Sequence, residues 1–411
     1  MSPTIFISAG EASGEHYGAL LIEALKRQLA AAGQTAAFFG MGGERMAAAG
    51  LQRVVRSEDM AVMGITEVLR HLPRIYREFR KLKQSARTRR PDVAILIDFP
   101  DIHFKLAREF HRLGVPVIFF VSPQLWAWKK RRIKLVRKYI RRMLVIFPFE
   151  EPFYRQRGVQ AEFVGHPLAE LPLPAVSREA FAAENGLNPE RTWIGLLPGS
   201  RPMEIRDNLP EILKAAWGLE ELELTGHGEF GEFQYLLPLA PTLNAEQRAA
   251  VLAVVEARGG GLDIRLVEDA RAALLHARAS VVASGTATVE AALIGNPFVV
   301  VYRVSWLTYA IAKLVVKVPH VAMANLIAGK RVVPELIQND FRAAKIVQQM
   351  EPLLPDGAPR ESMMKELKAI RGLLHSRQAG QTGGAIDRVA AITLEVLRTV
   401  SPAHNEDTVQ S

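Results

Sequence analysis

Short runs of β-branched and aromatic residues alternate along this chain with longer stretches in which apolar residues recur at helical spacing. This alternation is typical of βαβ units on a parallel sheet, and the continuous apolar runs suit strands that are covered on both faces. In the first part of the chain the predicted strands are Thr4–Ser8, Ala37–Phe39, Val93–Ile97, Val117–Val121 and Met143–Phe147. Helices are predicted at Gly14–Ala31 and Phe104–Leu113.

The alternation stops at a proline-rich segment, Gly165–Val176, and then starts again. The later predicted strands are Trp193–Leu197, Leu236–Leu239, Asp263–Leu266, Ala279–Ala283 and Pro297–Val301. The helices between them are predicted at Met203–Leu219, Ala245–Ala257, Ala270–His276 and Thr286–Ile294. This pattern predicts an α/β protein with two consecutive doubly wound domains, and we expect a ligand cleft between the carboxyl ends of their strands.

The predicted domain boundaries follow from the position of this linker. We predict an N-terminal Rossmann-like domain over residues 1–165 and a second Rossmann-like domain over residues 166–340. Helices over residues 341–400 are expected to pack back on the domains, and the polar tail over 401–411 is expected to be frayed.

Charge is distributed unevenly over the 411 residues. Lys and Arg number 52 against 43 Asp and Glu, and residues 129–142 carry nine of the basic residues and no acidic one. A patch of this density indicates a polyanionic partner, namely nucleic acid, an acidic membrane surface or a phosphorylated substrate. The absence of cysteine excludes disulfides and thiolate chemistry, and it fits a reducing compartment. No apolar run reaches the ~18–20 residues of a membrane span, and no signal peptide is evident, so we expect a cytoplasmic protein.

Four loops at predicted strand ends carry the candidate chemistry. The first predicted strand runs into small residues before a helix, where backbone can approach a ligand, although the dinucleotide fingerprint G-x-G-x-x-G is missing. The candidate residues of this glycine loop are Gly10, Glu11, Ser13, Gly14 and Glu15. The alternative is a tight structural turn in which Ser13 caps the following helix.

Asp98 follows a buried parallel strand, at the position where α/β enzymes place functional groups. Its carboxylate could accept a proton from a substrate hydroxyl if apolar neighbours such as Phe99 raise its pKa. The alternative is a carboxylate that only accepts hydrogen bonds from loop amides. Asp101 precedes a predicted helix, so we expect it to be the N-cap residue.

Two further strand–turn–helix segments, in the second predicted domain, are suited to anion binding. In the first, Gly199, Ser200 and Arg201 combine backbone N–H groups at a helix start with a guanidinium group, although there is no P-loop G-K-[ST]. The second, at Ser284, Gly285 and Thr286, offers hydroxyls and amides that suit a diphosphate, and Glu290 could hold ribose hydroxyls. The alternative for the second segment is an ordinary helix capped by Ser or Thr. The scattered histidines predict no metal site, and we expect no cofactor.

These segments in combination resemble the lipid-A-disaccharide synthase family. The motifs that carry the resemblance are SAGEASGE (8–15), AVMGITEVL (61–69), DVAILIDFPD (92–101), VSPQLWAWKKRRI (121–133), FPFEEPFY (147–154), FVGHPLAE (163–170), LLPGSR (196–201), SGTATVE (284–290) and ANLIAGK (324–330). They span about residues 4–340 in the family's order. Two departures are Glu15, where the family usually has Asp, and residues 221–262, which match little.

The resemblance implies a GT-B glycosyltransferase of two facing Rossmann-like domains. It implies the transfer of a sugar from UDP-2,3-diacylglucosamine to 2,3-diacylglucosamine 1-phosphate, with inversion, no dedicated metal and release of UDP. Under it, Asp98 is the expected general base on the acceptor 6-hydroxyl, and Arg201 is expected to neutralise the donor phosphates. The remaining donor-side residues would be Gly199, Ser200, Ser284, Gly285, Thr286, Glu290 and Asn325.

Substrates with acyl chains imply contact with a membrane, and the sequence offers two surfaces for it. The first pairs aromatic with basic residues: Trp126, Trp128, Lys129, Lys130, Arg131 and Arg132. The second is the apolar and basic stretch Val62–Lys83, for which core packing is the alternative. We expect peripheral association with the inner membrane, and the sequence leaves a homodimer open.

Three other functions remain open at this stage. One is another UDP-sugar GT-B transferase with a lipid-linked acceptor, and a second is a UDP-sugar epimerase. The third is a nucleic-acid-binding protein that uses residues 129–142, but no helix-turn-helix, RRM or KH signature supports it, and no nucleic acid is expected.

Overall fold

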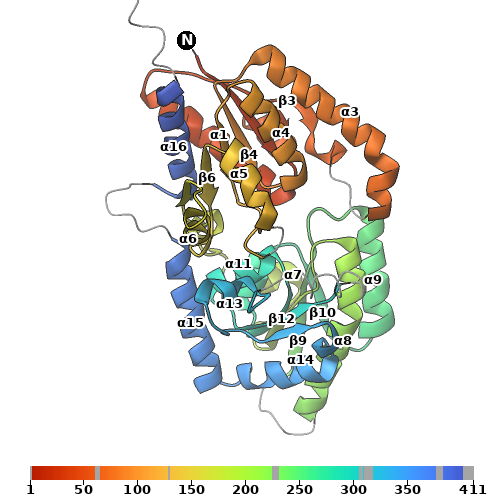
Figure 1. Cartoon of the computed structure of the whole chain (residues 1–411). Coiled ribbons are helices and arrows are strands. Elements are labelled where there is room, and N and C mark those ends of the chain that lie inside the picture. Colours follow the sequence, from red (N-terminus) through yellow and green to blue (C-terminus); the bar gives the residue numbers. More distant parts are fainter. Residues whose placement is uncertain are drawn as a thin grey trace, which may run out of the picture. The chain divides into compact units, whose positions relative to one another are not determined.

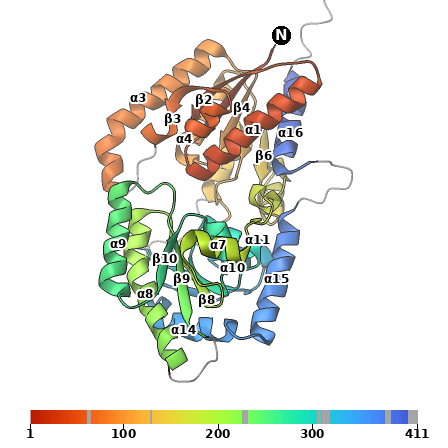
Figure 2. The ribbon, with the colours of Figure 1, turned by 180° about the vertical axis from the view of Figure 1, so that it is seen from behind.

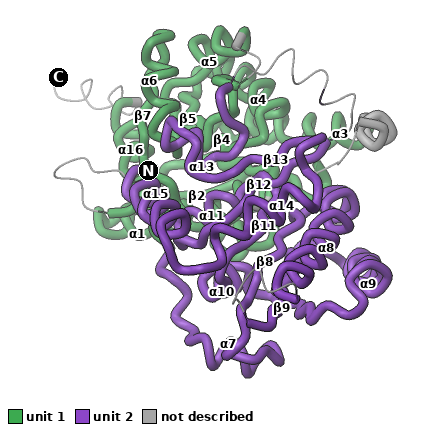
Figure 3. Tube along the Cα trace, turned by 90° about the horizontal axis from the view of Figure 1, so that it is seen from below, with its two compact units in different colours: residues 1–170, 374–411 green, residues 171–373 purple. Residues whose placement is uncertain are grey.

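The computed structural model describes residues 2–60, 65–127, 130–224, 231–304, 309, 318–375 and 383–400. The chain divides into two compact units, coloured separately in Figure 3. Unit 1 holds residues 1–170 and 374–411, and unit 2 holds residues 171–373. The division therefore falls inside the proline-rich segment, between Glu170 and Leu171, and the predicted frayed tail 401–411 lies outside the described residues.

Unit 1 is built on a seven-stranded parallel sheet with the strand order β3-β2-β1-β4-β5-β6-β7. Its strands are β1 (Thr4–Ala9), β2 (Ala37–Gly42), β3 (Leu51–Arg56), β4 (Val93–Ile97), β5 (Val117–Phe120), β6 (Arg142–Val145) and β7 (Ala161–Phe163). The order reverses between β1 and β4, and ligands of doubly wound sheets bind outside the carboxyl ends of the strands at this switch point. The two loops that follow β1 and β4 meet there.

The helices of unit 1 include one from the far end of the chain. They are α1 (Ala12–Ala31), α2 (Glu44–Ala48), α3 (Ile65–Arg89), α4 (Pro100–Arg112), α5 (Ile133–Tyr139), α6 (Glu150–Arg155) and α16 (Ala385–Val400). Helix α16 lies beside α1 in Figures 1 and 2. Arg27 of α1 forms an ion pair with Asp387, and the buried Arg388 donates through Nε to the Val164 carbonyl at 2.7 Å. These contacts join the C-terminal helix to the first domain.

Unit 2 is built on a six-stranded parallel sheet with the order β10-β9-β8-β11-β12-β13. Its strands are β8 (Thr192–Leu197), β9 (Phe233–Pro238), β10 (Ile264–Val267), β11 (Ala279–Ala283), β12 (Phe298–Tyr302) and β13 (Glu335–Ile337). Its helices are α7 (Arg178–Asn185), α8 (Pro202–Leu224), α9 (Ala245–Gly259), α10 (Ala270–His276), α11 (Thr286–Ile294), α13 (Met323–Ala328), α14 (Ala343–Met350) and α15 (Ala358–Leu374). The fully buried Trp193 belongs to the core of this unit, which packs β8 and β9 against α7 and α10.

The predicted α/β class and all ten predicted strands are confirmed, with ends that differ by at most three residues. Strand β3 was not predicted, because its sequence LQRVVR places charged residues between apolar ones and only part of it is buried. Strands β7 and β13 have three residues each, too few for a period to emerge. None of the helices within the described ranges combines the length and the apolar character that crossing a membrane requires.

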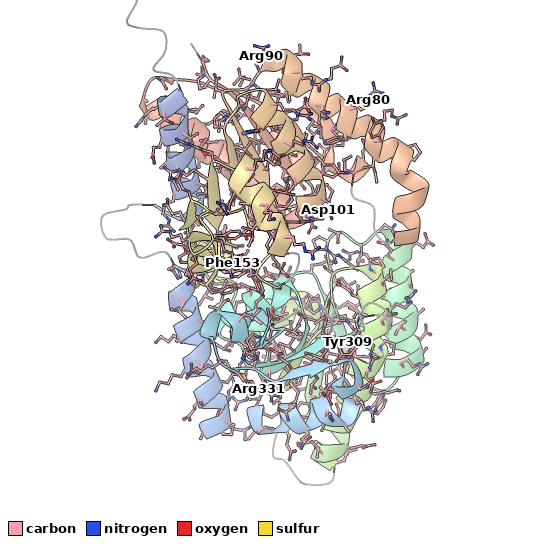
Figure 4. The ribbon with its side chains drawn as sticks, viewed as in Figure 1. Arg80, Arg90, Asp101, Phe153, Tyr309 and Arg331 are labelled. Carbon is pink, nitrogen blue, oxygen red and sulfur yellow. The ribbon has the colours of Figure 1, made fainter. Side chains whose placement is uncertain are left out.

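Two predicted helix caps are wrong. Helix α1 begins at Ala12 with Glu11 at the N-cap position, so that Ser13 lies inside the first turn and caps nothing. Helix α4 begins at Pro100 with Phe99 at the N-cap position, and Asp101 is its second residue (Figure 4). Proline is favoured at the first helical position because its missing N–H is not needed there, and here it starts the helix one residue before Asp101.

Candidate active site

Asp98 lies in a strained turn at the carboxyl end of β4. Asp98 and Phe99 have φ angles of 52° and 51°, in the left-handed region that residues other than glycine avoid. Each such residue costs about 1–3 kcal/mol, and it persists only where the surrounding structure holds it. The Asp98 N–H donates to the Phe120 carbonyl of β5 at 3.0 Å, and the chain then turns directly into α4. Two consecutive strained residues therefore lie at the position predicted to be the general base.

The environment of Asp98 favours a carboxyl group that titrates near neutrality. Burial, and after it the neighbouring Glu11 carboxylate, raise its pKa from the ordinary 3.8 to about 7, against the opposing effect of a hydrogen bond from the Phe99 backbone amide. A carboxylate with a pKa close to the working pH is well matched to accepting a proton. The structure thus brings Glu11 of the glycine loop close to Asp98.

Glu15 has a structural contact that the sequence does not reveal. Its carboxylate accepts a hydrogen bond from the Arg45 backbone N–H at 2.9 Å, in the first turn of α2. A side-chain acceptor at a helix start satisfies an N–H group that has no partner within the helix. Glu15 therefore anchors α2 on α1, and Gly14 lies beside it in the first turn of α1.

The first predicted anion-binding loop of unit 2 follows β8. Gly199 has φ 123°, which allows the chain to turn from the strand into α8. The Glu204 carboxylate accepts hydrogen bonds from the backbone N–H groups of Ser200 and Arg201 at 3.3 and 3.4 Å, and it pairs with the Arg201 guanidinium at 3.5 Å. These donors thus already hold a negatively charged group, so their geometry suits an anion. Glu204 was not predicted as part of this loop, although a Glu at the third helical position is a known capping signal.

The second loop follows β11, which pairs in parallel with β8, so both loops lie at one edge of the sheet. Helix α11 begins at Thr286 with Gly285 at the N-cap position, and no side-chain hydrogen bond caps it. The alternative of a helix capped by Ser or Thr is therefore wrong. The Ser284 N–H donates to the Val301 carbonyl of β12 at 2.9 Å and fixes the start of the turn. The uncapped N–H groups of α11 remain oriented for an anion.

The other two predicted donor-side residues differ in what they can offer. Glu290 is partly buried, burial raises its pKa against the opposing charge of Arg271, and no hydrogen bond to its carboxylate occurs within the described ranges. Asn325 is fully buried, and its amide donates to the Val333 carbonyl and the Glu335 carboxylate while accepting from the N–H groups of Val332 and Val333. Glu290 has free acceptors for a ligand, whereas Asn325 uses both of its donors and both lone pairs inside unit 2.

Tyr302, at the end of β12, is a residue that sequence reasoning missed. Burial raises the pKa of its phenol, the charge of Glu204 raises it further, and that of Arg201 lowers it. Strand β12 pairs with β11, so its end reaches the same edge of the sheet as the two predicted anion-binding loops. Tyr302 therefore adds a phenol hydroxyl beside Arg201.

Trp126 is tethered inside unit 1 through a buried carboxyl group. Its indole N–H donates to Glu150 at 3.1 Å, and the Ser122 hydroxyl donates to the same oxygen at 2.9 Å. The Trp126 ring also packs edge-on against Phe149, with the ring centroids 5.0 Å apart. Burial raises the pKa of Glu150 to about 7, more than these donors lower it. The loop that precedes the basic segment is thus fixed to α6 from within.

Replacing Glu150 by glutamine is expected to weaken the pH dependence of stability. The folded pKa of about 7 exceeds the ordinary 4.5, so between these values the folded state binds a proton that the unfolded chain has released. The free energy of unfolding consequently falls as the pH rises through this window, and it falls no further above the folded pKa. Glutamine cannot ionise, so the variant should gain up to about 3 kcal/mol relative to the parent between about pH 5 and about pH 8. Thermal unfolding at both pH values measures this gain, and an identical pH dependence in both proteins would contradict it.

The basic segment presents a one-sided cationic face. Arg132 pairs with Asp101 and Arg142 pairs with Glu395. The remaining described basic side chains are exposed and have no carboxylate partner within the described ranges: Arg131, Lys134, Arg137, Lys138 and Arg141. Leu135, 37% exposed, lies among them. Trp128 and Lys129 lie outside the described residues, and so does the side chain of Lys130.

The second predicted membrane surface is only partly described. Residues 61–64 and the side chains of 65–72 lie outside the description. In the remainder of α3, Leu82 is fully buried and Ile75 and Phe79 pack against the core of unit 1, whereas Tyr76 is 63% exposed. Core packing therefore accounts for most of the described apolar stripe.

The two parallel Rossmann-like sheets with their alternating helices define a protein of the GT-B class. Solved structures of the same fold include MurG from Acinetobacter baumannii (TM-score 0.54, 15% identity, covering 96% of this chain and 100% of that one) and the calicheamicin glycosyltransferase CalG4 (TM-score 0.56, 18% identity, 98% and 100%). A UDP-GlcNAc 2-epimerase from Neisseria meningitidis, solved with UDP-GlcNAc bound, shares it as well (TM-score 0.51, 11% identity, 97% and 100%). The fold alone thus leaves both transferase and epimerase open.

Relatives found by sequence decide between a glycosyltransferase and an epimerase. The model of the lipid-A-disaccharide synthetase family matches residues 5–387. The lipid-A-disaccharide synthases of Acidobacterium capsulatum and Koribacter versatilis are 58% and 47% identical to this chain; the first match covers 97% of both chains, the second 95% of this chain and 98% of its relative. The chain belongs to the lipid-A-disaccharide synthase family and is a glycosyltransferase.

Proposed function

We propose that this chain joins UDP-2,3-diacylglucosamine to 2,3-diacylglucosamine 1-phosphate, forming the β(1→6) lipid A disaccharide 1-phosphate and UDP. The name of its relatives supports the reaction. The structural observation that carries the proposal is the strained turn at Asp98, which holds a carboxyl group with a pKa of about 7 at the carboxyl end of β4. A single base of this kind is enough for an inverting transfer, because inversion is one displacement.

In the proposed step, the Asp98 carboxylate takes the proton of the acceptor 6-hydroxyl as its oxygen bonds to the anomeric carbon of the donor. The bond from that carbon to the diphosphate oxygen breaks, and its electron pair leaves with UDP. Each bond formed is matched by one broken, and the proton ends on Asp98. The base must therefore be ionised before the step and must release a proton after it.

Unit 2 is proposed to stabilise the charge that grows on the departing UDP. Arg201 and the N–H groups of Ser200, together with the uncapped start of α11 at Gly285 and Thr286, supply preorganised donors. Ser284 would add its hydroxyl, and Glu290 would bind ribose hydroxyls with its free oxygens. Asn325 would act by holding the segment that follows α13, since its own amide is fully engaged.

Activity is expected to rise with pH through about 7. The Asp98 pKa of about 7 means that the protonated, inactive form predominates at lower pH, so kcat/KM should fall about tenfold per pH unit below it. Replacing Glu11 by glutamine removes a charge that raises the pKa of Asp98. The acidic limb of the pH profile of kcat/KM should therefore move to lower pH in this variant. Measuring kcat/KM between about pH 5 and about pH 9 for both proteins tests this expectation. A limb that does not move in the Glu11→Gln variant would contradict the assignment.

We propose peripheral association with the cytoplasmic face of the inner membrane through the basic segment. The exposed cationic residues around Leu135 support this proposal, because each basic side chain near an anionic surface contributes about 1 kcal/mol. Trp126 would have an indirect role. Its hydrogen bond to Glu150 would hold the loop that precedes the basic segment in place.

Reversing two charges of this face, with Arg137→Glu and Lys138→Glu together, should weaken binding to anionic vesicles by at least about tenfold. Sedimentation with phosphatidylglycerol-containing vesicles measures the partition. Lys365→Glu with Lys368→Glu, on exposed positions of α15, is the matched control and should bind like the parent. Equal losses in the two double variants would show that net charge, rather than this face, governs binding.

UDP release with and without acceptor tests the proposed reaction. The wild-type chain should release UDP from the diacylated donor only when the diacylglucosamine 1-phosphate acceptor is present. Turnover of the donor without acceptor would instead support an epimerase, and UDP release with other lipid-linked acceptors alone would support another transferase.

A further inference from the structure

The first glycine-loop motif begins with a residue that has no part in the proposed chemistry. Ser8, at the end of β1, is fully buried, and so is His103 of α4. The Ser8 hydroxyl lies 2.8 Å from His103 Nε2, and His103 Nδ1 lies 2.6 Å from the carbonyl oxygen of Asp98. A buried chain of hydrogen bonds thus joins the end of β1 to the backbone of Asp98.

The chemistry of the two partners fixes the direction of each hydrogen bond. A carbonyl oxygen can only accept, so His103 must carry its proton on Nδ1 and donate it to Asp98. Burial lowers the pKa of His103 to about 4, so the imidazole is neutral near pH 7 and Nε2 keeps a free lone pair. Ser8 must then donate its hydroxyl proton to Nε2. The only consistent arrangement runs from Ser8 through His103 to the Asp98 carbonyl.

Phe99, the second strained residue, is held by the same group of side chains. Its ring packs edge-on against His103, with the centroids 5.8 Å apart. The Phe99 ring also lies against Gly10, where a Cβ atom would come within 2.4 Å of the ring. Glycine is therefore required at position 10 to admit the ring.

We propose that Ser8 and His103 are positioning residues, which lock the peptide between Asp98 and Phe99 in its left-handed turn and so orient the Asp98 carboxylate. This inference rests on the proposed role of Asp98 as the base. Two consecutive residues with positive φ need contacts that over-determine them, and the His103 bond supplies one at the carbonyl itself. A catalytic group that moves by about 1 Å can lose about 10²-fold in rate.

Two matched variants separate positioning from ordinary core packing. In His103→Asn the amide nitrogen occupies the place of Nδ1 and can still donate to Asp98, whereas in His103→Gln it reaches only the place of Nε2. The asparagine variant loses only the hydrogen bond from Ser8, so its kcat should stay within about tenfold of the parent. The glutamine variant should lose about 10²-fold in kcat, with an unchanged affinity for UDP. His111→Gln, at an exposed position of the same helix, is the control and should match the parent.

The pH profile gives a second readout that packing alone would not change. The asparagine variant should keep the acidic limb near pH 7, and the glutamine variant should move it lower, because a relaxed turn exposes the carboxylate. Equal kcat in the two variants, or a greater loss with asparagine, would overturn the inference. If His103→Gln does not fold, Ser8→Ala replaces it and should lower kcat without changing UDP affinity. An active Asp98→Asn variant would instead overturn the role of Asp98 itself, which keeps the two failures distinguishable.

Discussion

Replacing Asp98 by asparagine is expected to lower kcat for disaccharide formation by about 10²–10⁴-fold, the usual contribution of a positioned general base. Asparagine keeps the size and the hydrogen-bonding shape of the side chain, but it cannot take the acceptor's proton. The Asp98 N–H bond to Phe120 and the His103 bond to the Asp98 carbonyl both involve the backbone, so the turn should survive. UDP affinity should be unchanged, because the proposed diphosphate donors belong to unit 2. Steady-state kinetics together with calorimetric UDP titration measures both quantities.

Asp101→Asn is the matched control for this variant. Asp101 is three residues further along the chain, is exposed, and pairs with Arg132. It should lose little activity, because an exposed ion pair contributes at most about 1 kcal/mol. Near-wild-type turnover in Asp98→Asn, or an equal loss in both variants, would remove Asp98 from the role of base.

Replacing Arg201 by alanine should lower kcat/KM by about 10²–10³-fold, the range observed when one preorganised charge-stabilising donor is removed. The guanidinium is 56% exposed and pairs only loosely with Glu204, so it is available to a ligand. Its loss also leaves the Glu204 carboxylate among the backbone N–H groups without a neutralising charge. UDP binding should therefore weaken in parallel with turnover, in contrast to the Asp98 variant.

Arg206→Ala provides the comparison on the same helix. Arg206 is exposed on α8 and bonds to its neighbour Asp207, so its removal changes the net charge by the same amount at a site with no proposed ligand. Its kinetics should match those of the parent. If Arg201→Ala left UDP affinity unchanged, the loop after β8 would not be the diphosphate site.

The sequence predicted those features that depend on local pattern. Buried strands such as β8 and β11 have continuous apolar sequences, and a parallel sheet then requires their carboxyl ends to meet at one edge, which brings the loops at Ser200 and Ser284 together. For α11 the local sequence left a Ser or Thr cap open, and only the structure shows that Gly285 stands at the N-cap position without a side-chain cap.

Contacts between distant residues could not be predicted in this way. Nothing near His103 in the sequence indicates that its ring contacts Ser8, 95 residues earlier, and Glu15 bonds to a backbone N–H 30 residues away. The positive φ angles at Asp98 and Phe99 contradict local propensity, and only tertiary contacts stabilise them. The hydrogen bond from the Trp126 indole N–H to Glu150 could not be predicted either. The pattern of aromatic and basic residues made Trp126 a candidate for membrane contact and gave no sign of this bond.

The anomeric configuration of the product offers the most direct test of a single displacement driven by Asp98. Purified chain, donor and acceptor are incubated together, and the new glycosidic bond is assigned by NMR after mass spectrometry has established the disaccharide. A β(1→6) linkage formed from the α-linked UDP-sugar is the predicted result. An α linkage would require a second displacement and a nucleophile on the protein, and it would contradict the assignment of Asp98 as the general base of an inverting transfer.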